Sequence, residues 1–240
     1  MAVKEDLFYQ EDLRQLAKAV HYQQWQVDMV KNYVKGHTLE VGGGIGNFTR
    51  QLAKLSHTVT TVEPNKYCIE QLRVKVRDLI NVTVVEGMIE DVDITKKFDT
   101  IILMNVLEHI RDDYSTIAAL KKLLTPTGRI VVLVPSCQWA FGTTDERLDH
   151  FRRYDKPMAR KLAAGTNLDL IALRYYNFIG IWGWWFNARI LKHTGQSSAQ
   201  IFVFDNFIVP ILSRIERFIV PPVGQSILFV FQNQLTAGAV

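Results

Sequence analysis

The sequence predicts an open, doubly wound α/β fold, in which a mostly parallel sheet carries helices on both faces. Two observations predict it. From about residue 39, short runs rich in β-branched residues alternate with longer helical stretches, which is typical of βαβ units. A glycine-rich turn, Glu40-Val-Gly42-Gly-Gly44-Ile-Gly46, follows the first run and opens a helix. In such a sheet, ligands bind outside the carboxyl ends of the strands.

The elements follow one another in a regular order. Residues 1–36 predict an N-terminal helical cap, because apolar side chains recur there at helical spacing. Strands are predicted over 37–41, 58–63, 81–87, 98–105 and 129–136. Helices are predicted over 47–55, 66–78 and 113–124, the last of them ended by a Thr-Pro-Thr-Gly turn at 125–128. A polar loop over 138–155, a helix over 156–164 and strands over 168–178 and 225–231 complete the pattern.

Composition excludes several classes of protein. The 240 residues are 48% hydrophobic and 22% charged, which is the range of a folded domain. Lys and Arg are scattered among acids, so the net charge of +4 predicts no nucleic-acid partner. Two unpaired cysteines favour a reducing cytoplasm. The N-terminus has no apolar signal region, and the uncharged stretch 175–188 is shorter than the roughly 20 residues of a spanning helix, so we expect no membrane crossing.

Two acids specify the ligand expected at the glycine turn. Glu40 lies two positions before the first glycine, where its charge would repel a pyrophosphate, so a cationic ligand is favoured over a dinucleotide. Glu63, followed by Pro64, ends the second strand, the position from which an acid accepts both ribose hydroxyls of an adenosine. A purely structural glycine turn and a solvated Glu63 are the alternatives.

These motifs, with Glu86-Gly87-Met88 and Asn105-Val106-Leu107-Glu108-His109, resemble class I S-adenosylmethionine-dependent methyltransferases. The chain is most similar to their small-molecule branch, which includes quinone-biosynthesis enzymes. The resemblance implies a Rossmann-like seven-stranded sheet whose last strand is antiparallel. It implies a core over 37–177 and 224–240, with 178–223 as a hydrophobic insertion or lid. It also implies S-adenosylmethionine as cofactor, S-adenosylhomocysteine as product, and no metal.

The resemblance also implies a set of cofactor-binding residues. Glu40 and the glycines would line the methionine moiety, and Glu63 would bind the ribose. Relatives often carry an acid where Met88 stands here, so Glu90 or Asp91 would replace it at the adenine amino group. Cap residues would close over the amino-acid end, with core packing as the alternative. The full set is Tyr22, Trp25, Glu40, Gly42, Gly44, Gly46, Glu63, Pro64, Gly87, Met88, Ile89, Asn105 and Val106.

Candidates for the chemistry lie near the carboxyl ends of the fourth and fifth strands. His109 and His150 are candidate general bases, because the pKa of histidine lies near neutrality. Packing against the cofactor is the alternative for His109, and anchoring of the loop is the alternative for His150. Tyr154 could orient a hydroxyl, and Arg152 and Arg153 could bind a carboxylate or phosphate. An internal ion pair with Asp145, Glu146 or Asp149 is the alternative for the arginines.

The segment 178–223 is dense in aromatic residues. Its tryptophans, among them the candidate substrate-binding Trp182 and Trp185, are too many for a solvated loop. Residues 201–219 are apolar around most of the predicted helix, which Pro210 should break. An acceptor lid, a homodimer contact and a peripheral membrane contact all remain open for this segment.

The function predicted from the sequence is methyl transfer to an O or N atom of a small, rather apolar or ring-bearing metabolite in the cytoplasm. Methylation of carbon remains open. One alternative is a methyltransferase that acts on a lipid-linked or glycan intermediate at the membrane face. A second alternative, from a different class, is a non-catalytic cofactor-binding or scaffold protein. Glu40 disfavours a nicotinamide dehydrogenase, because its charge would repel the pyrophosphate of the dinucleotide.

Overall fold

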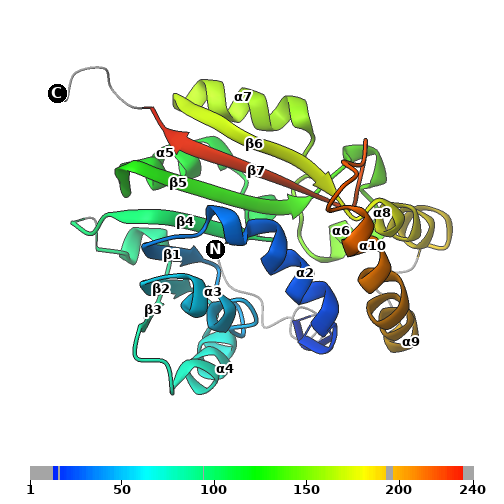
Figure 1. The fold of residues 1–240 in the computed structure, drawn as a ribbon, viewed down its shortest axis with the longest axis horizontal. Helices are drawn as coiled ribbons and strands as arrows, with labels where there is room; N and C mark the ends of the chain where they lie inside the picture. The colour runs from blue at the N-terminus through cyan, green and yellow to red at the C-terminus, as the bar shows by residue number, and fades with distance from the viewer. Residues whose placement is uncertain (1–12, 16, 94, 193–196, 235–240) are drawn as a thin grey trace.

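Seven strands form one sheet in the part of the chain that the structure describes. The computed structural model describes residues 13–15, 17–93, 95–192 and 197–234. The strand order is β3-β2-β1-β4-β5-β7-β6 (Figure 1). The first five strands pair in parallel, and β7 lies antiparallel between β5 and β6. The strands are β1 (His37–Val41), β2 (Thr58–Glu63), β3 (Val82–Glu86), β4 (Phe98–Met104), β5 (Leu124–Pro135), β6 (Leu168–Tyr176) and β7 (Ser226–Asn233). The predicted fold class is confirmed.

Helices pack on both faces of this sheet. They are α2 (Val20–Val30), α3 (Thr49–Leu55), α4 (Lys66–Val76), α5 (Asp113–Lys122), α6 (Thr143–Arg147), α7 (Lys156–Thr166), α8 (Phe178–Trp185), α9 (Ser198–Val203) and α10 (Val209–Ile215). Successive strand residues face opposite sides. Ile101 therefore joins a core with α5 and α7, while Ile102 joins a core with α2, α3 and α10. The first half of the predicted N-terminal cap lies largely outside the described residues.

Two connections differ from the sequence prediction. Residues 125–128, predicted as a turn, lie within β5, but they have no partner on β4, because the pairing passes from Phe98–Leu124 directly to Thr100–Arg129. The predicted polar loop 138–155 contains a 3₁₀ turn (Gln138–Ala140) and the short helix α6.

The segment between β6 and β7 is helical almost throughout its described part. The predicted break at Pro210 is wrong: α9, a π-helical turn (Phe204–Ile208) and α10 run on without a gap. Pro210 lies in the first turn of α10, and the wider π turn before it accommodates the missing N–H. This helical stretch lies beside α2 (Figure 1).

Residues Ser198–Ile215 form a helix that length and composition would allow to cross a membrane, the one such helix in the described chain. Its mean hydropathy is 1.2, and 17% of it is buried inside the molecule. The sequence argument missed this stretch because it considered only uncharged runs.

Candidate functional site

The glycine turn connects β1 to α3 at the carboxyl edge of the sheet. Gly42, Gly44 and Gly46 all have positive φ values, of 75°, 52° and 79°. A Cβ on Gly42 would lie 2.5 Å from Cγ2 of Val106, a candidate cofactor residue that follows β4. The Gly42 amide donates to the Val62 carbonyl at 2.9 Å. Glycine is therefore needed at position 42 for two reasons: its φ is positive, and the Val106 side chain leaves no room for a Cβ.

Two carboxylates are buried beside this turn. Glu40 accepts a hydrogen bond from Thr49 Oγ1 at 2.6 Å, and Glu63 accepts from the amides of Gly44 and Asn65 at 2.8 and 2.9 Å. Burial raises the pKa of Glu40 to about 7 and raises the pKa of Glu63 as well. No basic side chain in the described residues forms an ion pair with either acid. Two acids held this way favour a ligand that brings positive charge and hydroxyl donors.

The remaining predicted cofactor residues lie along the same edge. Pro64 follows β2, and the Gly87 amide after β3 donates to the Glu63 carbonyl at 3.1 Å. Met88 is exposed, and its amide donates to Asp91 Oδ2 at 2.8 Å, so the Asp91 carboxylate already has a backbone partner. Ile89 lies in the 3₁₀ turn that follows Met88 and packs partly against the core. Asn105, directly after β4, has a φ of 55°.

Tyr22 and Trp25 of α2 lie in different surroundings. Trp25 is 5% exposed and belongs to the core with Met29 and Met104, which is the packing alternative offered above. Tyr22 packs edge-on against Trp25 and Phe204, with ring centroids 6.3 Å apart in both pairs. Tyr22 also lines a cavity, so of the two residues it is the one placed to contact a ligand.

This cavity of about 650 Å³ lies between α2, α8 and the helical stretch 198–208. Its lining is mainly apolar and aromatic, and it includes Trp182. A few polar side chains interrupt the lining, namely Asn187, Gln200, Asp205 and Gln225. Trp185 lies elsewhere, at a second hollow of about 430 Å³ beside Arg189. The size and lining of the larger cavity suit a small, ring-bearing molecule.

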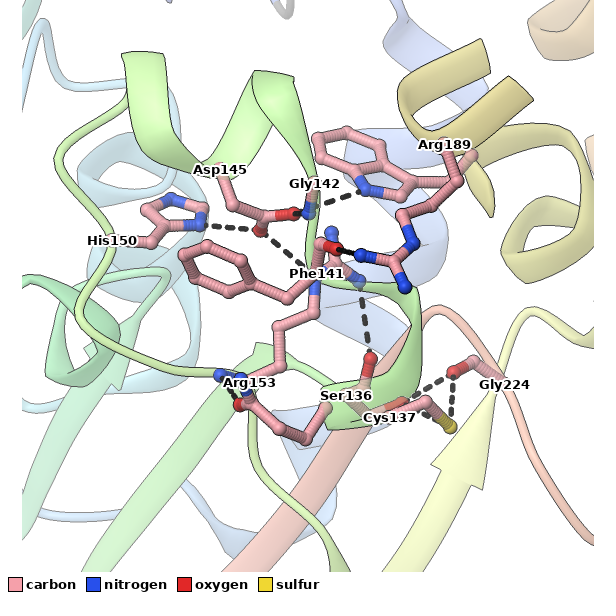
Figure 2. A network of polar contacts seen from close by, with 11 residues as sticks. Ser136, Cys137, Phe141, Gly142, Asp145, His150, Arg153, Arg189 and Gly224 are labelled. Atoms are coloured by element: carbon pink, nitrogen blue, oxygen red, sulfur yellow. Dashed lines mark hydrogen bonds and ion pairs between the residues drawn. The ribbon is translucent and has the colours of Figure 1, made fainter. Parts of the chain in front are cut away.

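Asp145 lies at the centre of a buried polar network (Figure 2). It accepts from His150 Nδ1 at 2.8 Å, Arg153 Nε at 2.8 Å and the Gly142 amide at 3.1 Å. Burial acts to raise the pKa of Asp145, but the hydrogen bond from His150 and the charge of Arg153 outweigh it and lower that pKa. Arg153 is fully buried, and its guanidinium carbon lies 4.6 Å from the Trp184 ring centroid. The structure thus places Arg153 in the ion pair suggested as its alternative.

Arg152 and Tyr154 both bind Asp113, at the start of α5. Arg152 Nη1 lies 2.7 Å from Asp113 Oδ2, and the Tyr154 hydroxyl donates to the same oxygen at 2.8 Å. Burial, followed by the charge of Asp113, raises the pKa of Tyr154. Tyr154 is 1% exposed, so a role with an acceptor would require its hydroxyl to leave Asp113.

The two candidate histidines come together in the fold. Their ring centroids are 4.7 Å apart and the rings are nearly perpendicular. Burial, with the nearby His150, lowers the pKa of His109 to about 3, which makes His109 a weak base. Glu108 beside them was not singled out from the sequence, although it directly precedes His109. Burial and then the nearby Asp145 raise the pKa of Glu108 to about 8, against the opposing effects of its own amide and of Arg153.

Comparison with known proteins finds methyltransferases among the sequences and structures that are similar to this chain. Residues 39–132 match the family described as "Methyltransferase domain". Uncharacterized methyltransferases are similar to the chain: one from Alkaliphilus oremlandii is 24% identical over 63% of this chain, and one from Bacillus thuringiensis is 32% identical over 52% of it. The chain spans 66% and 59% of the length of these relatives.

A solved structure extends the likeness to nearly the whole fold. The N-methyltransferase NodS from Bradyrhizobium japonicum WM9, in complex with S-adenosyl-L-homocysteine, has a TM-score of 0.53 and 16% identity, covering 96% of this chain and 90% of that one. The sheet order defines a Rossmann-like α/β fold, and the glycine turn with its two acids lies where such folds bind ligands. The family match runs from β1 into β5, and the likeness to solved structures shows that the chain has the fold of S-adenosylmethionine-dependent methyltransferases.

Proposed function

We propose that the protein transfers the methyl group of S-adenosylmethionine to an O or N atom of a small, rather apolar or ring-bearing molecule in the cytoplasm. The observation that carries this proposal is the pair of buried acids, Glu40 and Glu63, on either side of the glycine turn. Glu40 would face the cationic methionine end, and Glu63 would accept from the ribose hydroxyls. The family match over 39–132 supports the same cofactor.

The sulfonium of the bound cofactor would supply an electrophilic methyl carbon, so the chain needs mainly to align the acceptor and exclude water. The 650 Å³ cavity is the proposed acceptor site. Its aromatic wall, with Tyr22 and Trp182, would hold a ring, while Asn187 and Gln225 would orient polar groups.

Calorimetry with S-adenosylmethionine, S-adenosylhomocysteine and NADH tests the cofactor assignment. We expect the first two to bind and NADH not to bind. Glu63→Ala should weaken S-adenosylmethionine binding by about 1–3 kcal/mol, because the buried ribose hydroxyls lose their acceptor. Glu86→Ala is the matched control: Glu86 is the register neighbour of Glu63 on β3, but it is partly exposed and pairs with Arg73. Equal affinity in wild type and Glu63→Ala would refute the assignment.

A second candidate is methylation of a lipid-linked acceptor at a membrane face. The observation that favours it is a row of exposed apolar side chains, one every four residues, along and beyond the 198–215 helix: Val203, Phe207, Ile211, Ile215 and Ile219. Arg214 and Arg217 are also exposed there. A helix with one face packed on the protein and an exposed apolar row beside cations suits the surface of an anionic bilayer.

Co-sedimentation with phosphatidylglycerol-containing vesicles distinguishes this second candidate. We expect the wild-type protein to sediment with vesicles and Phe207→Ser combined with Ile211→Ser to remain in solution. Ile80→Ser is the control, because Ile80 is fully exposed but lies outside the insertion. Absence of wild-type binding would eliminate the membrane candidate and leave the cytoplasmic proposal intact.

A further inference from the structure

A carboxylate and two imidazoles converge beyond the carboxyl end of β4. Glu108 and His109 lie in the 3₁₀ turn Leu107–His109, and His150 follows α6. One ligand atom from each of the three residues lies within 4.8 Å of the other two. These elements are adjacent in part because the Phe151 amide donates to the Glu108 carbonyl at 2.8 Å.

Glu108 lacks partners for its charge. Its side chain is completely buried, and neither carboxylate oxygen accepts a hydrogen bond from any other described residue. The charge of Arg153 lowers the pKa of Glu108, but Arg153 Nε and Nη1 donate to Asp145 and to the Ser136 carbonyl, and the buried Nη2 has no hydrogen-bond partner among the described residues. A buried carboxylate without donors is costly, so such groups in proteins are paired or coordinate a metal.

The His150 imidazole is already held through one ring nitrogen. His150 Nδ1 donates to Asp145 Oδ1 at 2.8 Å, which leaves Nε2 free (Figure 2). The backbone of Leu148 acts to raise the pKa of His109, against the larger opposing effects of burial and of His150. Histidines that ligate metals almost always donate their second nitrogen to a carboxylate or carbonyl in this way. Asp145 is in turn fixed by Arg153 and Gly142.

We propose that Glu108, His109 and His150 form a binding site for one divalent transition-metal ion. Two imidazole nitrogens and one carboxylate suit Zn²⁺, Co²⁺ or Fe²⁺ better than Mg²⁺ or Ca²⁺, which prefer oxygen ligands. Ligand atoms about 2.1 Å from such an ion lie about 3–3.4 Å apart, so the three donors need only close inward from 4.8 Å. Three protein ligands leave a coordination position for another molecule.

This site differs from what the sequence predicted. The resemblance implied no metal, and His150 was a candidate general base. A nitrogen bound to a metal cannot accept a proton, so the proposal gives His150 a different role. Binding of a metal ion at this site does not depend on methyl transfer. Its test therefore requires no cofactor and no acceptor.

The test uses untagged, chelator-treated protein titrated with ZnCl₂ by calorimetry and with Co²⁺ by visible absorption. We expect one ion per chain, Co²⁺ absorption bands of a protein-ligated site, and no competition from Mg²⁺. Glu108→Gln and His150→Gln should each weaken Zn²⁺ binding by about 100-fold or more, since second-sphere changes alone cost about 10–100-fold. His57→Gln is the matched control, because the exposed His37 and His57 rings form the other close histidine pair among the described residues, 5.6 Å apart.

Three results would overturn the proposal. The wild-type protein could bind no ion stoichiometrically, and this measurement stands even where a variant does not fold. Zn²⁺ binding could survive in Glu108→Gln with folding intact by circular dichroism. Binding could instead disappear in His57→Gln, which would assign the ion to the surface pair. Thermal unfolding of each variant without metal separates loss of the site from loss of the fold.

Discussion

Glu40 is a buried acid whose charge costs stability. Its pKa of about 7 in the folded protein lies well above the ordinary value of 4.5, chiefly because burial removes water from the carboxylate. The folded state therefore retains its proton to higher pH than the unfolded state does. The stability linked to this proton is fully present below pH 4.5 and is lost as the pH rises through 7.

We predict that Glu40→Gln is more stable than the wild type at pH 8 by up to about 3 kcal/mol, and nearly equal to it at pH 4.5. The amide keeps an acceptor for Thr49 but carries no charge to desolvate. Urea unfolding at the two pH values measures the difference. A gain of the same size at both values would contradict the pKa explanation. S-adenosylmethionine affinity should fall in the same variant, because the charge that faces the cation is gone.

The site residues differed in how far the sequence could predict them. Glu40 and Glu63 could be proposed from the sequence because each lies at a fixed position relative to a strand end, and strand ends follow from local patterns. For Arg153 the sequence left anion binding and an internal ion pair open, and the chain buries it against Asp145, eight positions earlier. Glu108 gave no signal of its own. Its lack of partners is a property of the packed fold.

At the scale of elements, Asp205 of the insertion caps α2 of the N-terminal region. It accepts from the backbone amides of His21 and Tyr22 at 3.3 and 2.8 Å, and its side chain is buried. The residue at the N-cap position of α2 is Ala19, which has no side-chain acceptor. The Asp205 carboxylate, 184 positions from His21 in the sequence, therefore caps α2. Its negative charge also interacts favourably with the helix dipole.

Asp205→Ala should lower the free energy of unfolding by about 1–2 kcal/mol, the usual effect of losing a cap. It should also increase proteolytic cleavage within 198–220, because the variant loses one tie between the helical stretch and α2. Asp28→Ala is the control, since Asp28 lies on α2 but makes a partly exposed contact with Lys31. Equal cleavage rates in wild type and Asp205→Ala would show that apolar packing alone holds the stretch.

The elements divide into those that local sequence specifies and those that it does not. The five parallel strands and the helices α3, α4, α5 and α7 follow from periodicity and capping residues such as Asn65 and Asp112. The π turns at Phe186–Ile190 and Phe204–Ile208 have no such signature. Pro210 even argues locally against the helix that contains it. The first π turn contacts α6 and α8, and the second contacts α2.

At the scale of the whole molecule, stability should be unevenly distributed. Strands β4 and β7 and residues 130–134 of β5 are mostly buried, whereas only 17% of the 198–215 helix is buried. We predict that hydrogen exchange measured by mass spectrometry is slowest in β4, β5 and β7 and much faster over 198–215, because amides with few buried contacts open locally. The comparison is made at several protein concentrations. Slow exchange over 198–215 at all dilutions would contradict the prediction.

The position of β7 also has a consequence for synthesis on the ribosome. This strand is the last of the seven in the chain, yet it fills the gap between β5 and β6 and pairs with both. Until residues 226–233 emerge, one edge of each neighbouring strand has no partner, and such edges invite pairing with other chains. A nascent chain must therefore keep two open edges apart while the apolar insertion is still being made. Slow translation through 178–225 would prolong the period in which this protein depends on chaperones.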